Sequence, residues 1–279
     1  MICPSPLRFI PRIMVVATLA MLLLVIGIAI YMNTGQRKEE ALETASRLSG
    51  QFVADCRKVS EESNIPWYYL AAYYQVLLEE SGQSKAYPSK KALQDLGAKL
   101  AACSSSKVQG KLKELEGKKT AEMIIDRAKV LKKGGTLFSA QYIFPVKQNE
   151  IRYTDTWLAP RDGGERQHLG TDVFATEGTP VYACTDGAIS RMGWNELGGN
   201  RIGLTGQDGI YYYYAHLHSY APGLQEGSRV SKGQFLGTVG HTGNAAGTPD
   251  HLHFGMLLNW EKWINPYNFL VYWDLQQGQ

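Results

Sequence analysis

The sequence predicts a multidomain α+β protein with an N-terminal transmembrane helix, a small all-α region and a carboxy-terminal antiparallel β domain. Three observations lead to this prediction. Residues 13–31 form a run without a charged side chain, and apolar residues recur at three- and four-residue intervals after it. Twenty of the 29 glycines lie at or beyond residue 163, among short strand-like runs. The expected boundaries are residues 1–36 for the cytoplasmic tail and anchor, 37–135 for the helical region and 140–275 for the β domain.

Composition and charge narrow the class of protein. The chain has 279 residues, of which 44% are hydrophobic and 20% charged, as in ordinary globular proteins. A net charge of +3 and the lack of a long basic arm argue against a nucleic-acid partner. Cys56 and Cys103 fall in the helical region and could pair, whereas Cys184 lies in an apolar run and is expected in the core. The oligomeric state stays open.

The N-terminal apolar run is interpreted as a membrane anchor. Ile13 to Tyr31 is nineteen residues long, which at ~1.5 Å per residue approaches the ~30 Å thickness of a bilayer core. A cleaved signal peptide is the alternative, but its apolar core is usually ~7–15 residues long and ends at a small-x-small site. Arg8 and Arg12 precede the run and are partly offset by Arg37 and Lys38 after it. The free amino terminus and the acidic Glu39-Glu40 favour a single-pass protein of the cell membrane with an extracytoplasmic carboxy-terminal domain.

Helix start and stop signals divide the middle of the chain. Pro66 and Gly82 mark the two ends of one helix, Ser89 is a candidate N-cap, and Gly134 follows a lysine-rich helix end. The expected helices are residues 41–56, 67–80, 90–102 and 120–133.

After residue 135 the pattern is that of strands. Asp208-Gly209 lies between two alternating runs and predicts a tight hairpin. Further strand-like runs, separated by glycine turns, are residues 181–184, 235–239 and 252–258. The prediction is an antiparallel β domain.

All six histidines of the chain fall within this β region, between His168 and His253. In a strand, side chains at i and i+2 share a face, so His251 and His253 present two imidazoles side by side. His168 and Asp172 supply another imidazole and a carboxylate. Two histidines and one aspartate suit zinc, and three protein ligands leave a fourth position for water, which is typical of a catalytic site.

Several motifs of this region occur in a defined order. Residues 142–270 carry Phe144-Pro145-Val146, Pro160-Arg161, His168-Leu-Gly-Thr-Asp172, Gly178-Thr-Pro-Val181, Tyr214-Ala-His216-Leu217, Val239-Gly-His-Thr-Gly243 and His251-Leu-His253-Phe254. With these motifs the region resembles the M23 (lysostaphin/LytM-like) zinc metallopeptidases, which cut peptidoglycan peptides.

The resemblance implies specific roles for five residues. One zinc ion per chain would be bound by His168, Asp172 and His253, while His216 and His251 would be the unliganded catalytic histidines. The implied function is a membrane-anchored zinc endopeptidase that hydrolyses peptide bonds of bacterial peptidoglycan through a zinc-activated water. The alternative is a non-enzymatic cell-wall scaffold or an activator of another hydrolase.

The bond that would be cut is left open by the sequence. Residues 64–72 look similar to a segment of membrane-anchored wall endopeptidases of endospore-formers, including one that cuts the L-Ala–D-Glu bond during sporulation. Glycyl bridges and bonds at diaminopimelate are the alternatives. Tyr214, or another tyrosine of the run Tyr211–Tyr214, is a candidate contact for the oxyanion. Asp250 could support a ligand, His218 is expected at the rim, and His241 lies in a glycine-rich turn.

Overall fold

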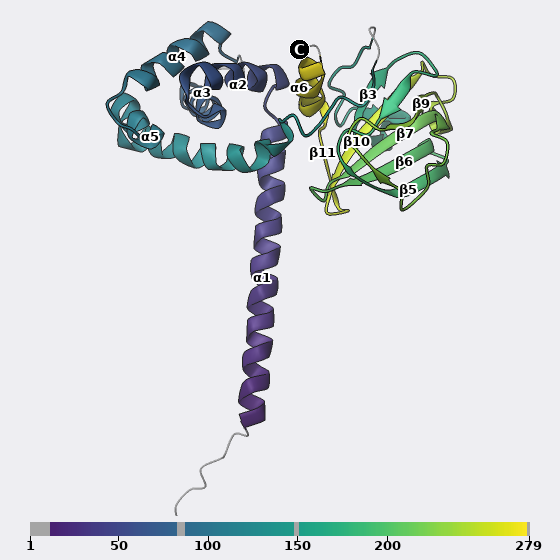
Figure 1. Cartoon of the computed structure of the whole chain (residues 1–279), viewed down its shortest axis with the longest axis horizontal. Coiled ribbons are helices and arrows are strands. Elements are labelled where there is room, and N and C mark those ends of the chain that lie inside the picture. Colours follow the sequence, from purple (N-terminus) through teal and green to yellow (C-terminus); the bar gives the residue numbers. More distant parts are fainter. Residues whose placement is uncertain (1–11, 83–86, 148–150, 278–279) are drawn as a thin grey trace, which may run out of the picture. The chain divides into compact units, whose positions relative to one another are not determined.

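The structure is a computed structural model that describes residues 12–82, 87–147 and 151–277 (Figure 1). The chain divides into two compact units, Met1–Glu40 and Ala41–Gln279. The second unit contains helices and an antiparallel sheet. The three-part division expected from the sequence stays a prediction.

The predicted transmembrane anchor is wrong, and with it the single-pass membrane localisation. Helix α1 (Arg12–Ser46) does run through the apolar segment, yet among the described residues no helix combines the length and hydropathy that crossing a membrane requires. A span needs about 20 apolar residues. Beyond the apolar segment, α1 continues through Arg37, Lys38 and Glu39. The predicted cytoplasmic tail falls in part on residues 1–11, outside the described residues.

Four further helices form the helical region, α2 (Gly50–Ser63), α3 (Trp67–Ser81), α4 (Lys90–Ala102) and α5 (Val108–Gly134). The predicted helix over residues 41–56 is divided between α1 and α2, because the hydroxyl of Ser49 accepts a hydrogen bond from the Phe52 amide and caps a new helix. The predicted end of α3 at Gly82, which has φ of 63°, is confirmed, as is the Ser89 cap of α4.

Helix α5 begins twelve residues before the predicted start and bends at Gly117, whose φ is 77°. In the part of α5 before this bend, the side chain of Leu112 is fully buried. The pairing considered for Cys56 and Cys103 is not formed, since both thiols are free. Cys184 is fully buried, as predicted.

The antiparallel sheet predicted for the carboxy-terminal region is confirmed. The nine-stranded sheet has the order β11-β10-β7-β6-β5-β8, while β3 also pairs with β10 and β9 pairs with both β7 and β4. The predicted hairpin at Asp208-Gly209 joins β6 to β7, with φ of 80° at Gly209. A separate two-stranded ribbon is formed by β1 and β2. The strands are β1 (Pro160–Arg161), β2 (Arg166–Gln167), β3 (Thr171–Phe174), β4 (Pro180–Tyr182), β5 (Gly187–Asn195), β6 (Gly199–Gly206), β7 (Tyr211–Tyr220), β8 (Arg229–Val230), β9 (Phe235–Val239), β10 (His251–Leu258) and β11 (Lys262–Ile264).

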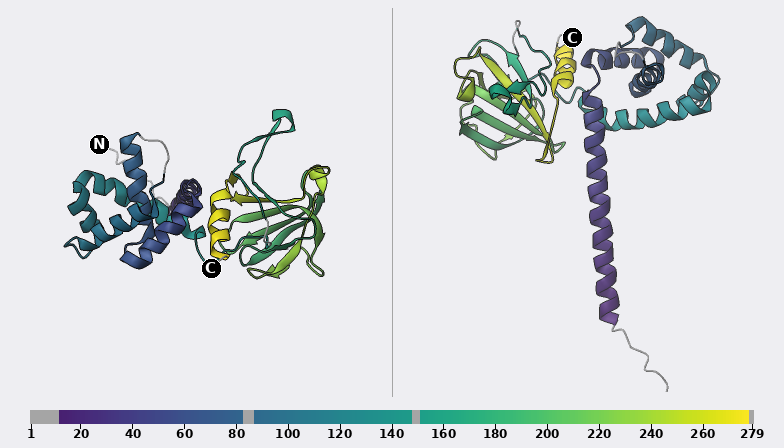
Figure 2. Two further views of the ribbon diagram at one scale, coloured as in Figure 1. Left: turned by 90° about the horizontal axis from the view of Figure 1, so that it is seen from above. Right: turned by 180° about the vertical axis from the view of Figure 1, so that it is seen from behind.

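Helix α6 (Tyr267–Gln277) closes one end of the sheet and was not predicted (Figure 2). Trp273 stacks on Tyr142 at 5.4 Å between ring centroids and meets Phe254 of β10 edge-on at 6.2 Å. Its indole nitrogen donates a 2.7 Å hydrogen bond to the carbonyl of Leu137. The core beneath β10 is therefore completed by residues near the end of the described chain.

Candidate active site

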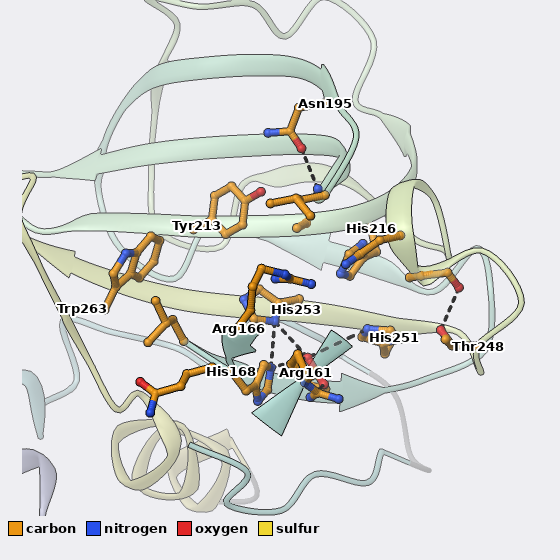
Figure 3. Close-up of a pocket in the computed structure, with 18 of the residues that line it drawn as sticks. Arg161, Arg166, His168, Asn195, Tyr213, His216, Thr248, His251, His253 and Trp263 are labelled. Carbon is orange, nitrogen blue, oxygen red and sulfur yellow. Dashed lines mark hydrogen bonds and ion pairs between the residues drawn. The ribbon is translucent and has the colours of Figure 1, made fainter. Parts of the chain in front are cut away.

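Strand β10 carries the site because it lies between β3 and β7. His253 is opposite Asp172 of β3 on one side and Ala215 of β7 on the other. Alternation along the strand places His251 on the same face as His253, and His216 follows directly after Ala215. Register alone therefore brings residues from three distant parts of the chain to one point (Figure 3).

Three side-chain atoms converge at this point. His168 Nε2 lies 3.0 Å from Asp172 Oδ1 and 3.0 Å from His253 Nδ1, and His253 Nδ1 lies 2.9 Å from the same carboxylate oxygen. On the other edge of the His168 ring, Nδ1 lies 3.1 Å from the Thr156 carbonyl. The Thr156 hydroxyl lies 2.9 Å from the same Nδ1. A carbonyl only accepts and a hydroxyl can accept, so the tautomer with its proton on Nδ1 bonds Thr156 and turns the Nε2 lone pair toward the cluster.

This donor set fits a zinc ion. A tetrahedral zinc with bonds of about 2.0–2.1 Å places neighbouring ligand atoms roughly 3.3 Å apart, close to the separations observed. The second carboxylate oxygen, Asp172 Oδ2, accepts a hydrogen bond of 2.6 Å from Arg161, which fixes the orientation of the carboxylate. Gly170 leaves room for the His253 ring, because a Cβ at this glycine would lie only 2.5 Å from His253 Cε1.

The ionisation of the cluster also suits a cation. Burial alone would raise the pKa of Asp172, but hydrogen bonds with His168 and His253 outweigh it and hold that pKa far below its usual range. Burial lowers the pKa of His253, although Asp172 opposes that effect. His253 is therefore neutral and Asp172 ionised at pH 7, which are the forms that bind metals.

The two remaining predicted histidines stand beside this cluster. The rings of His216 and His251 are 4.9 Å apart between centroids, and His251 Nε2 lies 3.9 Å from Asp172 Oδ1. Their Nδ1 atoms lie 2.8 Å from the carbonyls of Thr242 and Pro249 respectively. Burial lowers the pKa of His216 to about 4, so this imidazole is neutral at pH 7. All five residues singled out by the sequence thus meet in one place.

A cleft of about 840 Å³ contains these side chains. Of its aromatic wall, sequence analysis named only the run Tyr211–Tyr214 as a source of candidate contacts, because the other wall residues come from different strands and turns. One wall is aromatic and consists of Tyr211, Tyr213, Trp260 and Trp263. Basic side chains also line the cleft, namely Arg161, Arg166 and Arg191.

Other candidates from the sequence lie outside the reacting centre. Tyr214 is fully buried and its hydroxyl accepts a hydrogen bond from the Cys184 amide, so it packs in the core instead of facing the cleft. His218 is exposed, and its expected place at the rim stays a prediction. Asp250 contacts His241 at 2.7 Å, and none of its described hydrogen bonds reaches His168 or His253.

Comparison with known families adds the decisive observation. Residues 166–266, which include all five site residues, match the model of peptidase family M23. The carboxy-terminal domain belongs to this family. M23 peptidases are zinc enzymes, and the donor set of the M23 domain agrees with that chemistry. The M23 domain is thus a zinc metallopeptidase domain.

Individual relatives of the M23 domain differ in the bond named in their descriptions. The chain is 35% identical over 170 residues to the L-Ala–D-Glu endopeptidase of Bacillus subtilis (strain 168), covering 57% of this chain and 52% of that protein. It is 35% identical over 102 residues to the peptidoglycan DD-endopeptidase ShyC of Vibrio cholerae serotype O1, covering 37% and 23%. The chain therefore spans at most about half the length of these relatives.

Among solved structures, the chain is similar to a protein from Ruminococcus gnavus ATCC 29149 described as a glycyl-glycine endopeptidase, LytM. The TM-score is 0.51 and the sequence identity 28%, with 81% of this chain and 88% of that chain covered. This similarity extends beyond the M23 domain into the helical region.

Proposed function

We propose that the protein is a zinc endopeptidase that hydrolyses peptide bonds of bacterial peptidoglycan. In this proposal His168, Asp172 and His253 hold the zinc ion, and His216 and His251 are the catalytic histidines. The observation that carries it is the convergence of three donor atoms, 2.9 to 3.0 Å apart, beside two further imidazoles in one cleft. The activities named for the relatives support peptidoglycan as the substrate class.

Zinc, when bound, would supply a water of pKa near ~7 and polarise the carbonyl of the bond to be cut. The protein supplies the proton transfers. Because Nδ1 of His216 and of His251 each face a carbonyl, both rings direct the Nε2 lone pair elsewhere when neutral. One imidazole can then take the proton of the attacking water and pass it to the departing amine, and the other, once protonated, can donate to the oxyanion.

The charge of the cleft favours an acidic stem peptide over a glycine bridge. Arg161 pairs with Asp172, and Arg166 pairs with Asp162. Among the described residues that line the cleft, these two aspartates are the only carboxylates, and each already pairs with another arginine. The charge of Arg191 can therefore pair with a carboxylate of the substrate. Its guanidinium carbon lies 5.9 Å from the centre of the Trp260 ring, at the aromatic wall. Stem peptides carry free carboxylates, whereas glycine bridges do not.

The scaffold alternative gains no support from this site, because all five positions are filled and the donor atoms converge. A scaffold would not need to hold stoichiometric zinc. The expected role in sporulation and the expected domain boundaries stay predictions.

The test is digestion of purified peptidoglycan by the full-length chain loaded with zinc, followed by mass spectrometry of the released muropeptides. We expect new peptide termini in the stem, and His253→Ala should lose activity together with the zinc ion held by His168, Asp172 and His253. Glu196→Gln, which changes an exposed carboxylate in the turn between β5 and β6, is the control and should behave as wild type. Undiminished cleavage by His253→Ala would refute the assignment, and intact peptidoglycan with the zinc-loaded wild type would refute the function.

A further inference from the structure

A second group of metal-binding side chains lies apart from the cluster around Asp172. His241 Nδ1 lies 2.7 Å from Asp250 Oδ1 and 3.2 Å from Glu177 Oε2. The other oxygen of Glu177 lies 3.5 Å from His218 Nδ1. One donor atom from each of His241, Asp250 and Glu177 lies within 4.8 Å of the others. Two imidazoles and two carboxylates thus meet at the surface of the M23 domain.

Within this group, Nδ1 of His241 lies between the carboxylates of Asp250 and Glu177. His241 Nδ1 can donate one proton at most, yet it faces oxygens of both Asp250 and Glu177. Asp250 is already oriented, because its Oδ2 accepts a 3.1 Å hydrogen bond from the Glu177 amide. A divalent cation would satisfy both carboxylates at once and leave this supporting hydrogen bond in place.

The position of the group in the chain connects it to the catalytic histidines. His241 immediately precedes Thr242, whose carbonyl accepts from the His216 ring. Asp250 lies between Pro249, whose carbonyl accepts from the His251 ring, and His251 itself. Two members of the group are therefore adjacent to the two backbone carbonyls that orient the catalytic rings.

His218 and Glu177 complete this connection. His218 lies two residues after His216 on β7, and Glu177 lies three residues after the end of β3, the strand that carries Asp172. The main chain also links these segments, since the His251 amide donates a 3.0 Å hydrogen bond to the Gly240 carbonyl. A ligand held by the group would brace several loops around the cleft together.

We propose that Glu177, His241 and Asp250, with His218 as a further ligand, form a second divalent-cation site that braces the loops holding His216 and His251. The mixture of imidazole and carboxylate selects a borderline ion such as Zn²⁺, Co²⁺ or Ni²⁺ over Ca²⁺ or Mg²⁺. The side chains of His241, Glu177 and Asp250 are 46%, 39% and 32% exposed. This site therefore binds zinc more weakly than the buried cluster around Asp172.

Zinc binding to the full-length chain tests the proposal directly. Equilibrium dialysis against increasing zinc, with metal and protein content measured by mass spectrometry, should give two zinc ions per wild-type chain, one tight and one weaker. His253→Ala removes a member of the first cluster and should keep the weaker ion. Glu177→Gln combined with His241→Ala should keep only the tight ion, and the control Glu196→Gln should bind both.

Two results would overturn the proposal. One is a wild-type chain that binds a single zinc ion at saturation. The other is a second ion that persists in the Glu177→Gln, His241→Ala chain. Circular dichroism establishes that each variant is folded, and Glu177→Gln alone, which replaces one carboxylate oxygen, should still weaken the second ion if the double variant fails to fold.

The proposed bracing of the loops by the second cation can be measured separately, by a method that does not depend on enzyme activity. In His253→Ala, the weaker zinc ion should slow hydrogen exchange of the backbone amides in residues 240–251, as measured by mass spectrometry. Zinc should not change this exchange in a chain that also carries Glu177→Gln. If exchange in residues 240–251 is the same with and without the weaker ion, the bracing role is refuted.

Discussion

His216 and His251 face each other at 4.9 Å between ring centroids, and each ring is tied through Nδ1 to a backbone carbonyl at 2.8 Å. The two rings come from adjacent strands, β7 and β10. The arrangement gives both imidazoles the same tautomer, with an unprotonated Nε2 when neutral. Their orientation depends on two loops, since the acceptors are the carbonyls of Thr242 and Pro249.

Replacing either of the two histidines proposed as catalytic should separate chemistry from metal binding. We expect His216→Ala and His251→Ala each to lower kcat by roughly 10²–10⁴, the usual contribution of a general acid or base. The tight zinc ion should remain, because neither ring belongs to the converging donor set. Steady-state kinetics on a purified stem peptide and metal analysis of the same samples provide the comparison. Full activity in both variants would contradict the proposed roles.

Gly170→Ala should weaken the tight zinc ion without touching a ligand. An added Cβ would lie 2.5 Å from His253 Cε1 and 2.6 Å from the Phe254 carbonyl oxygen, so the imidazole must move. We expect zinc affinity to fall by about 10–100-fold, as for other changes that misorient ligands. Competition with a chromogenic chelator measures the affinity. Gly35→Ala, where nothing lies within 4 Å, is the matched control and should bind zinc as wild type does.

The stability of the metal-free protein should fall as pH decreases from about 6.5 to 4. Burial lowers the pKa of His216 to about 4 in the folded state, whereas an exposed histidine has a pKa of ~6.5. Between these values the unfolded chain binds a proton that the folded chain does not, so the free energy of unfolding decreases by about 1.4 kcal/mol per pH unit from this residue.

His216→Asn removes this contribution and should give a shallower dependence. Thermal unfolding of both chains in chelator at pH 7 and pH 4.5 gives the comparison. An equally large loss of Tm in wild type and variant would show that His216 is not the residue responsible.

Arg191→Gln should raise KM for an acidic stem peptide more than it lowers kcat. Arg191 lies at the aromatic wall, away from the five predicted site residues, so its charge acts on binding. Salt should reduce the difference between wild type and variant, because the interaction is screened. The control is the same peptide with its carboxylates amidated, for which the two enzymes should have similar KM values. An effect of equal size on both peptides would contradict carboxylate recognition.

The shared face of His251 and His253 was accessible from the sequence because strand geometry is local, whereas the roles assigned to the five site residues came from the resemblance to the M23 peptidases. The alternation of His251 and His253 predicts a shared face, and β10 does present both rings to one cleft. The carbonyls of Thr242 and Pro249, and the partnership of Arg161 with Asp172, depend on how loops close around the sheet. No residue pattern encodes such contacts.

The two larger errors of the sequence analysis, the predicted membrane span and the missed helix α6, arise because a local residue pattern does not determine what surrounds a helix in the fold. The run from Ile13 to Tyr31 predicted a membrane span, and the described part of α1 does not meet the requirements for one. Helix α6 was missed for a different reason. Its apolar residues do not follow a helical period, since it is covered by α2 and by the sheet, and a helix buried on several sides lacks the amphipathic signature.

The packing of Trp273 under β10 sets the smallest piece of this chain that can keep a working cleft. The ring of Phe254, the neighbour of His253, lies 6.2 Å from the Trp273 ring between centroids. The Trp273 indole donates a hydrogen bond to the carbonyl of Leu137, which precedes the residues that match the M23 family. A fragment trimmed to residues 166–266 would lose both supports and leave the underside of β10 exposed to water. Expression of the peptidase part alone therefore calls for termini drawn outside residues 137 and 277.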